Sequence, residues 1–211
     1  VFNGGTRLTE LPLKKEVREK LDASNPPKQN TIARKEVQAS EFQYYLRPGI
    51  YNVMVVIADE IFTYHLQLTY DGKKFEESDD VVKMAVVERY GHQLPPGLGL
   101  VKGTGLKAGA LAASVAHDCH NLLVIGSSEE EMAFALNTLI KKGGGFCVVE
   151  KGQVKAVQSL PVAGLISLDS AEEIAEKLRL LKIEFKKLGV VLEEPFLQLA
   201  FLALPVNPSL K

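Results

Sequence analysis

The chain has 211 residues, 46% of them hydrophobic, and a formal net charge of −1 at pH 7. This length and hydrophobic content are enough to bury the core of one large domain, with or without a small appendage. The balanced charge and the lack of a basic cluster exclude an electrostatic nucleic-acid binder. The longest apolar runs fall far short of the roughly 20 residues that span a bilayer, which excludes a membrane-spanning helix. Its two cysteines, Cys119 and Cys147, predict free thiols and a cytoplasmic protein.

The first 35 residues are predicted to form an appendage. Two short strands flank the turn Asn3–Gly5, Lys14–Leu21 has helical spacing, and the polar, proline-containing link Ser24–Lys35 follows. We therefore place the appendage over residues 1–35 and the main domain over residues 36–211. The abrupt opening hairpin also leads us to expect a processed chain or the downstream part of a longer polypeptide.

Apolar runs separated by turn signals predict the strands of the main domain. They cover Tyr51–Ala58, Ile61–Tyr70, Val81–Tyr90, Leu122–Gly126, Phe146–Glu150 and Gln153–Ser159. Polar residues alternate with apolar ones in the second run, so His65 is expected to face solvent. Glu88 and Arg89 are interpreted as surface charges near a strand end. The glycines between Leu98 and Gly109 match no phosphate-loop or dinucleotide motif, and we interpret them as turns and close strand packing.

Two capping boxes, Ser128–Glu131 and Ser170–Glu173, predict helix starts. The first helix is expected to end at Gly143–Gly145 and the second, the longest, to run to Gly189; Leu197–Leu204 is a last apolar element. Strands come in hairpin-like runs and helices mainly in the second half. The pattern therefore predicts an α+β fold, a mostly antiparallel or mixed sheet flanked by helices, with a short N-terminal β appendage.

Reactive side chains are concentrated in one short run, at the junction of two apolar elements. The run contains His117, Asp118, Cys119, His120 and Asn121. A hydrogen-bonded junction, in which Asp118 and Asn121 satisfy main-chain groups, and a functional site are both open interpretations of it.

Other chemistries are less well supported. A metal site needs three or four ligands, and the remaining histidines, His65 and His92, are isolated in the sequence. Catalytic partners of a cysteine usually come from distant segments, which argues against Cys119 as a nucleophile. Ser114 lacks the Gly-x-Ser-x-Gly pattern of a nucleophile elbow.

Five segments resemble, in the same order, the C-terminal region of bacterial and archaeal adenine deaminases. They are Asp79–Gly91, Gly103–Ala110, Ser114–Asn121, Pro161–Leu165 and Phe201–Val206. The resemblance is strong from residue 79 onward, although Cys119 stands where the family usually has serine.

This resemblance implies a domain or separately encoded subunit of a hydrolase that acts on a cyclic-amidine C–N bond, converting adenine and water to hypoxanthine and ammonia. It also implies that the amidohydrolase barrel, with manganese or iron as its metal, lies outside this chain. The barrel's early His-x-His pair and the zinc-deaminase signature are missing from the sequence. We therefore expect no catalytic residue and no metal ligand here, and an isolated chain that is inactive.

The polar run has a defined role on this interpretation. His117, Asp118, His120 and Asn121 would face the barrel as a hydrogen-bonding lid or would orient its catalytic groups. The expected partners are the barrel and the purine substrate adenine. Association with further copies of the same chain, as a homo-oligomer, is also open. Two alternatives stay open: a non-catalytic purine-binding or regulatory module on the same scaffold, and an autonomous metal hydrolase built on the polar run.

Overall fold

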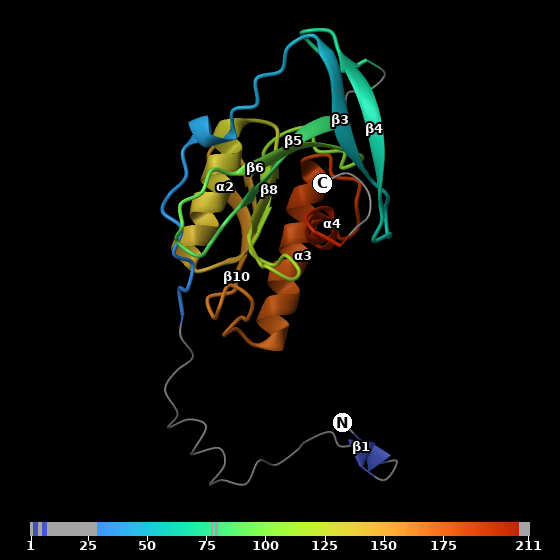
Figure 1. Ribbon diagram of the computed structural model, residues 1–211. Helices are drawn as coiled ribbons and strands as arrows, with labels where there is room; N and C mark the ends of the chain where they lie inside the picture. The colour runs from blue at the N-terminus through green and yellow to red at the C-terminus, as the bar shows by residue number, and fades with distance from the viewer. Residues whose placement is uncertain (1, 4–5, 8–28, 77, 79, 207–211) are drawn as a thin grey trace.

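The structure is a computed structural model that describes residues 2–3, 6–7, 29–76, 78 and 80–206. Its centre is a mixed sheet of eight strands (Figure 1). Its order is β10 (Gln153–Ser159), β9 (Gly145–Glu150), β7 (Ala110–Ala113), β8 (Leu122–Gly126), β5 (Val81–Val87), β6 (Gly97–Lys102), β3 (Gly49–Val56) and β4 (Thr63–Tyr70). β3 and β6 are parallel, and the other neighbours are antiparallel. The predicted α+β class is confirmed.

Helices cover both faces of this sheet (Figure 1). α2 (Glu129–Lys142) lies on one face, and α3 (Ala171–Lys187) and α4 (Pro195–Leu202) lie on the other. Successive side chains of a strand point to opposite faces, so Ala110 and Ala112 pack in the core with α2, while Leu111 packs in the core with α3 and α4. Coverage on both sides explains why every residue of β7 and β8 is buried.

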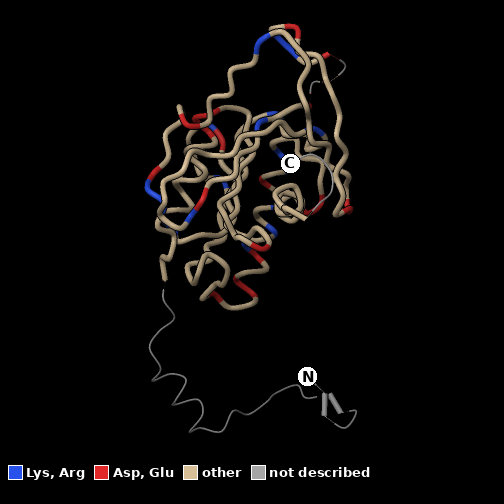
Figure 2. Tube along the Cα trace, viewed as in Figure 1, with Lys and Arg blue, Asp and Glu red and all other residues tan. Residues whose placement is uncertain are grey.

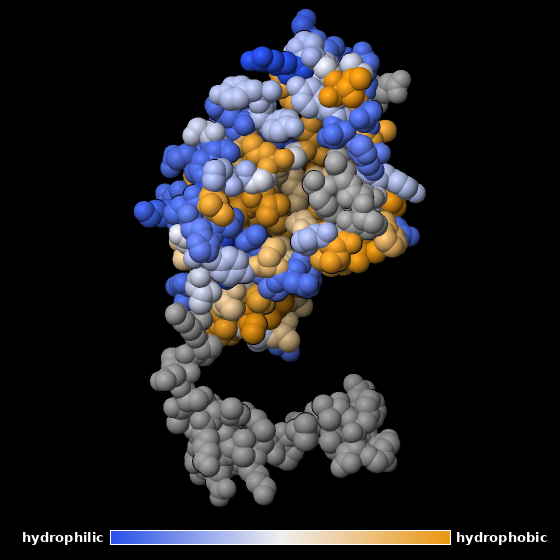
Figure 3. Space-filling model, in the orientation of Figure 1, coloured by the Kyte–Doolittle hydropathy of each residue, from blue (hydrophilic) through white to orange (hydrophobic). Residues whose placement is uncertain are grey.

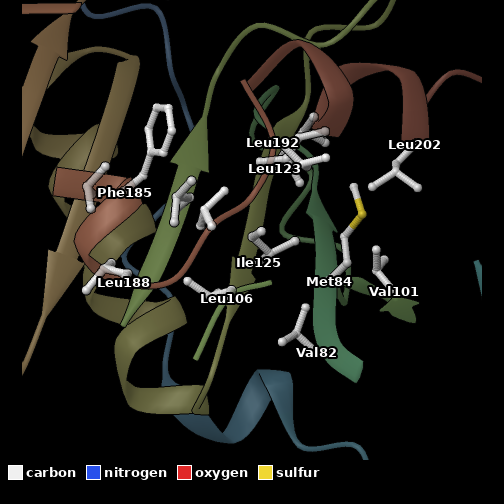
Figure 4. Packing of buried hydrophobic residues seen from close by; sticks show 14 of the residues in the cluster. Val82, Met84, Val101, Leu106, Leu123, Ile125, Phe185, Leu188, Leu192 and Leu202 are labelled. Atoms are coloured by element: carbon white, nitrogen blue, oxygen red, sulfur yellow. The ribbon is translucent and has the colours of Figure 1, made fainter. Parts of the chain in front are cut away.

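The core between the sheet and the C-terminal helices is shown in Figure 4. Leu123 and Ile125 of β8 pack in one cluster with Phe185 of α3 and with Leu188 and Leu192, which follow that helix. These contacts fix the central strands in place. Since Leu122 pairs with Val87, they also fix the end of β5 beside the start of β8.

The two predicted capping boxes differ in the structure. The second is complete, because Ser170 and Glu173 each accept a hydrogen bond from the other's main-chain N–H group. In the first, Ser128 Oγ accepts from the Glu131 N–H group at 3.3 Å, but Glu131 Oε1 accepts from Gly152 N at 3.1 Å. The Glu131 carboxylate thus bonds to the turn between β9 and β10, and the first capping box is formed only in part.

Several predicted element bounds shift. The first part of the glycine-rich stretch, Gly97–Lys102, forms strand β6, which was not among the predicted strands. Its glycines do allow the predicted close packing, since a Cβ atom added at Gly99 would lie 3.1 Å from Met54 Cε. The strand predicted over Val81–Tyr90 ends at Val87, and the last apolar element is helix α4.

The chain before the sheet contains smaller elements. β1 (Phe2–Asn3) and β2 (Thr6–Arg7) pair as the predicted hairpin, and a 3-10 helix, η1, spans Ala39–Phe42. The helix predicted over Lys14–Leu21 lies outside the described residues, and the boundary at residue 35 stays a prediction. In the ranges that the structure covers, no helix combines the length and apolarity needed to cross a membrane.

Candidate functional site

The polar run forms the loop between β7 and β8, which we call the 114–121 loop. Because β8 begins beside the end of β5, the loop lies next to the residues that follow β5. Two of these contact it directly. The Tyr90 hydroxyl donates a hydrogen bond to the carbonyl oxygen of Cys119, and Arg89 bonds to His120.

Arg89 joins the 114–121 loop to two other segments. Its side chain is buried, and Nη1 donates to the His120 carbonyl at 3.2 Å. Nη2 donates to the Ala163 carbonyl at 2.5 Å and to Thr31 Oγ1 at 3.3 Å. Burial lowers the pKa of Arg89, but an arginine remains protonated in proteins. The cation thus joins three segments through neutral oxygens, and within the described ranges no carboxylate forms an ion pair with it.

The interpretation of Arg89 as a surface charge is wrong, since its residue is only 5% exposed. The signal was present in the sequence: Ala85, Val87 and Arg89 follow the two-residue alternation of β5, and the first two are fully buried. Glu88 is half-buried. Although burial acts to raise it, the pKa of Glu88 is lowered because its carboxylate accepts hydrogen bonds from the Tyr90 and Gln93 N–H groups.

Ser114, at the start of the loop, has a structural position. Its side chain is fully buried. The hydroxyl donates to the Gly164 carbonyl at 2.6 Å and accepts from the Gly145 N–H group at 2.7 Å. Ser114 therefore joins the loop to β9 and to the turn that contains Gly164, and it has no exposed hydroxyl for a nucleophilic attack.

The two histidines of the loop lie against each other, with ring centroids 5.7 Å apart. The Ala116 N–H group donates to His120 Nδ1 at 3.2 Å, so the proton of the neutral imidazole is on Nε2. Burial lowers the pKa of His120, and the nearby charges of His117 and Arg89 lower it further, while Asp118 acts in the opposite direction. This arrangement favours a neutral His120 that can donate a hydrogen bond through Nε2.

The four predicted site residues differ in access. His117 and Asp118 are exposed, whereas His120 and Asn121 are half-buried. Asn121 Oδ1 is buried and has no hydrogen-bond partner among the described residues. His65 on β4 is exposed, as predicted, and its Nε2 shares a hydrogen bond with Asn52 Oδ1 on β3.

His117 also borders a groove of about 250 Å³ between the loop and the C-terminal helices. Two of its other lining residues are Phe146 and Phe196, whose ring centroids lie 4.9 Å apart. Glu194 lines the same groove. The groove therefore combines aromatic rings with one imidazole and one carboxylate.

The donor set does not fit a resident metal ion. The described parts of the chain contain no group of three or more His, Cys, Asp or Glu side chains arranged to hold one. His120 Nδ1 already accepts the Ala116 N–H group. The two cysteines are not bonded to each other, and burial raises the pKa of the Cys147 thiol to about 12, which keeps it protonated. We therefore assign no metal-dependent step to these residues.

The segment that leads into the sheet contacts the same region. Asn30 N donates to the Pro161 carbonyl at 3.0 Å, and Ala33 N donates to the Arg89 carbonyl at 2.8 Å. Asn30 and Ala33 belong to the predicted link Ser24–Lys35. Their hydrogen bonds fix the path of the chain beside the residues that hold the 114–121 loop.

Comparison with known proteins identifies relatives over the whole chain. The family described as the adenine deaminase C-terminal domain matches residues 60–211. An adenine deaminase of Bdellovibrio bacteriovorus is 54% identical over 211 residues, which is 100% of this chain and 36% of the relative. Adenine deaminases of Shewanella halifaxensis and Escherichia coli O157:H7 are each 49% identical, over 100% and 98% of this chain and 36% and 35% of their own lengths. The chain thus spans about a third of the length of the curated relatives that it matches.

Proposed function

The chain belongs to the adenine deaminase C-terminal domain family, and from this premise we propose that it is a non-catalytic domain or subunit of an adenine deaminase. In this proposal the complete enzyme converts adenine and water to hypoxanthine and ammonia in the cytoplasm. Its amidohydrolase barrel, with manganese or iron, lies outside the chain. The observation that carries the proposal is the match over residues 60–211, which includes the whole 114–121 loop.

We infer that the 114–121 loop faces the catalytic domain. His117 and Asp118 are exposed and can reach a surface placed against the loop. His120 offers Nε2–H as a donor, because its Nδ1 already accepts the Ala116 N–H group, and Asn121 follows it at the end of the loop. Arg89 and Ser114 supply the support, since Arg89 donates to the His120 carbonyl and the buried Ser114 hydroxyl donates to the Gly164 carbonyl. The four site residues would orient the catalytic groups or the purine and would not activate water. They are His117, Asp118, His120 and Asn121.

The first experiment is an assay of ammonia release from adenine by the purified chain, alone and together with the corresponding amidohydrolase barrel loaded with manganese or iron. We expect activity only when the barrel is present. Activity of the chain alone would contradict the proposal, and so would a barrel whose activity and stability do not change when the chain is added.

The second experiment tests the loop in the complete enzyme. We expect His117→Ala and Asp118→Ala each to lower kcat/KM by about tenfold, the effect of losing one positioned hydrogen bond. His92→Ala is the matched control, because His92 is an exposed histidine outside the loop. Unchanged turnover in both loop variants would remove the loop from the function.

A non-catalytic purine-binding or regulatory module is the second candidate, and the groove beside His117 favours it. A planar purine suits a groove lined by Phe146 and Phe196, with His117 and Glu194 able to hydrogen-bond to ring nitrogens. Calorimetric titration of the chain with adenine separates the candidates. Binding that Glu194→Gln weakens, in a chain that gives no activity with any barrel, would support the module.

A further inference from the structure

β4 is an edge strand with little protection against pairing with another strand. It has eight residues, Thr63–Tyr70, none of which is charged or proline. Its register with β3 is continuous over the full length, without a bulge. Figure 2 shows charged residues at the ends of this hairpin and none along the strands between them. Natural edge strands usually carry a charge, a proline or a bulge, because an open edge is a template for another strand.

The side chains of β4 divide into an apolar and a polar face. Tyr64, Leu66 and Leu68 share one face, and Tyr64 and Leu66 are 65% and 36% exposed. His65 and Gln67 share the other face and bond to Asn52 of β3. Figure 3 shows hydrophobic residues reaching the surface beside this hairpin. The edge therefore offers an apolar strip next to main-chain groups.

The direction of the main-chain groups follows from one contact at the end of β4. Tyr70 pairs with Gly49 of β3 on one side and with Phe75 on the other, where Glu76 N donates to the Thr69 carbonyl at 2.9 Å. The carbonyl of Thr69 thus points away from β3. Alternate residues of an antiparallel strand direct their N–H and C=O groups to the same side, so those of His65 and Gln67 also point outward.

These outward groups are available over a short stretch. In the described residues, no main-chain group bonds to the outward N–H and C=O groups of His65 and Gln67. At Thr69 the carbonyl is occupied by Glu76. The open edge is therefore Tyr64–Leu68.

We propose that Tyr64–Leu68 pairs antiparallel with the same segment of a second copy of this chain, about a two-fold axis at Leu66. His65 then lies opposite Gln67 of the second copy, and the reverse pair repeats the contact, as symmetry requires. The two pairs form about four main-chain hydrogen bonds, and the two Leu66 residues meet as a non-hydrogen-bonded pair. A register centred on Gln67 would instead need the Thr69 carbonyl, which is occupied.

A second copy fits this edge for two reasons. A strand without charges does not repel its own copy, whereas a charged strand would place like charges in opposition. The Leu66 register also places Tyr64 opposite Leu68 of the second copy and His65 opposite Gln67. One face of the extended sheet therefore stays apolar, and the other stays polar. The paired segment is short compared with the interfaces of obligate dimers. We therefore expect a reversible monomer–dimer equilibrium.

Sedimentation of the chain over a concentration series tests the proposal, which does not depend on the proposed function. Tyr64→Lys places two cations beside the axis and should weaken association by tenfold or more. Ile50→Lys is the control, since Ile50 is an exposed apolar residue of the same hairpin on β3. Association should be unchanged in this variant. A wild-type chain that stays monomeric throughout, or equal effects of both variants, would overturn the proposal.

Cross-linking tests the register. Facing residues of a non-hydrogen-bonded pair have Cα atoms about 4.5 Å apart, which suits a disulfide. Leu66→Cys, in a Cys119→Ser background, should give a disulfide-linked dimer on mild oxidation. Val154→Cys, an exposed position on the opposite edge strand β10, should not. Equal cross-linking at both positions would overturn the pairing of β4 with its own copy.

Discussion

Nη1 of Arg89 donates a hydrogen bond to the carbonyl oxygen of His120 at 3.2 Å, which connects the end of β5 to the 114–121 loop. The same guanidinium bonds to Ala163 and Thr31, so one buried side chain fixes three segments that are far apart in the sequence. The position of the candidate site therefore depends on a residue that is not itself exposed to a ligand.

We expect Arg89→Met to lower the free energy of unfolding by about 2–4 kcal/mol, because it removes the three part-buried hydrogen bonds through which the guanidinium joins these segments. Urea unfolding measures this as a lower midpoint at constant slope. Arg179→Met is the control, since Arg179 is largely exposed and pairs with Glu176 within α3. Its effect should be much smaller than that of Arg89→Met, because an exposed ion pair contributes little to stability. Equal losses in the two variants would contradict the role of Arg89.

The pKa of His120 should lie below its usual value of 6.5, as measured by NMR titration of the imidazole. Because burial favours the neutral form, this group contributes stability above the unfolded pKa, and the contribution is lost as pH falls through the folded pKa. We expect His117→Gln to raise the pKa of His120 and Asp118→Asn to lower it further. Shifts of the same sign in both variants would show that the nearby charges do not act as described.

Gly109→Ala should destabilise the fold by about 3 kcal/mol or more, since the added Cβ atom would lie 2.1 Å from the Val149 carbonyl oxygen at a φ of +69°. Gly152→Ala is matched in backbone conformation, with a φ of +65°, but has open space around the added atom. It should cost only about 1 kcal/mol, the penalty for a left-handed alanine. Thermal unfolding of both variants checks the difference, and similar losses would rule out the steric cause.

Asp169 should contribute to acid sensitivity. Lys177, Gln158 and Ser167 donate hydrogen bonds to its carboxylate and lower its pKa from 3.8 to about 2. A lowered carboxyl pKa gives stability that is present above pH 3.8 and is lost as pH falls toward 2. We expect Asp169→Asn, and also Lys177→Met, to flatten the dependence of unfolding free energy on pH in this range. Curves parallel to the wild type would contradict this.

Local patterns predicted much of the fold. The Ser170–Glu173 capping box and the strand Leu122–Gly126 appear in the structure as expected, because both depend on residues close in the sequence. Strand β6 was missed because glycines lower strand propensity, and its neighbours β5 and β3 supply the pairing that overrides this. Glu131 bonds to Gly152, a partner that no local pattern reveals.

The candidate site was predictable in part. The polar run does gather at one loop, and His117 lies against His120. The residues that hold the loop were not found, because Arg89, Ala163 and Thr31 meet through tertiary structure alone. Whether the loop faces a catalytic domain stays a prediction.

The ladder that joins β3 to β6 contains two registered pairs, Met54 with Val101 and Val55 with Lys102, whereas β3 and β4 pair over eight. The hairpin is thus bound more strongly to itself than to the remainder of the sheet. It should behave as a separate cooperative unit that opens at a lower free energy than the central strands, so its amide protons exchange earlier under native conditions. Any partner bound along β4 would raise that opening free energy, and slower exchange would then report occupancy of the edge without a functional assay.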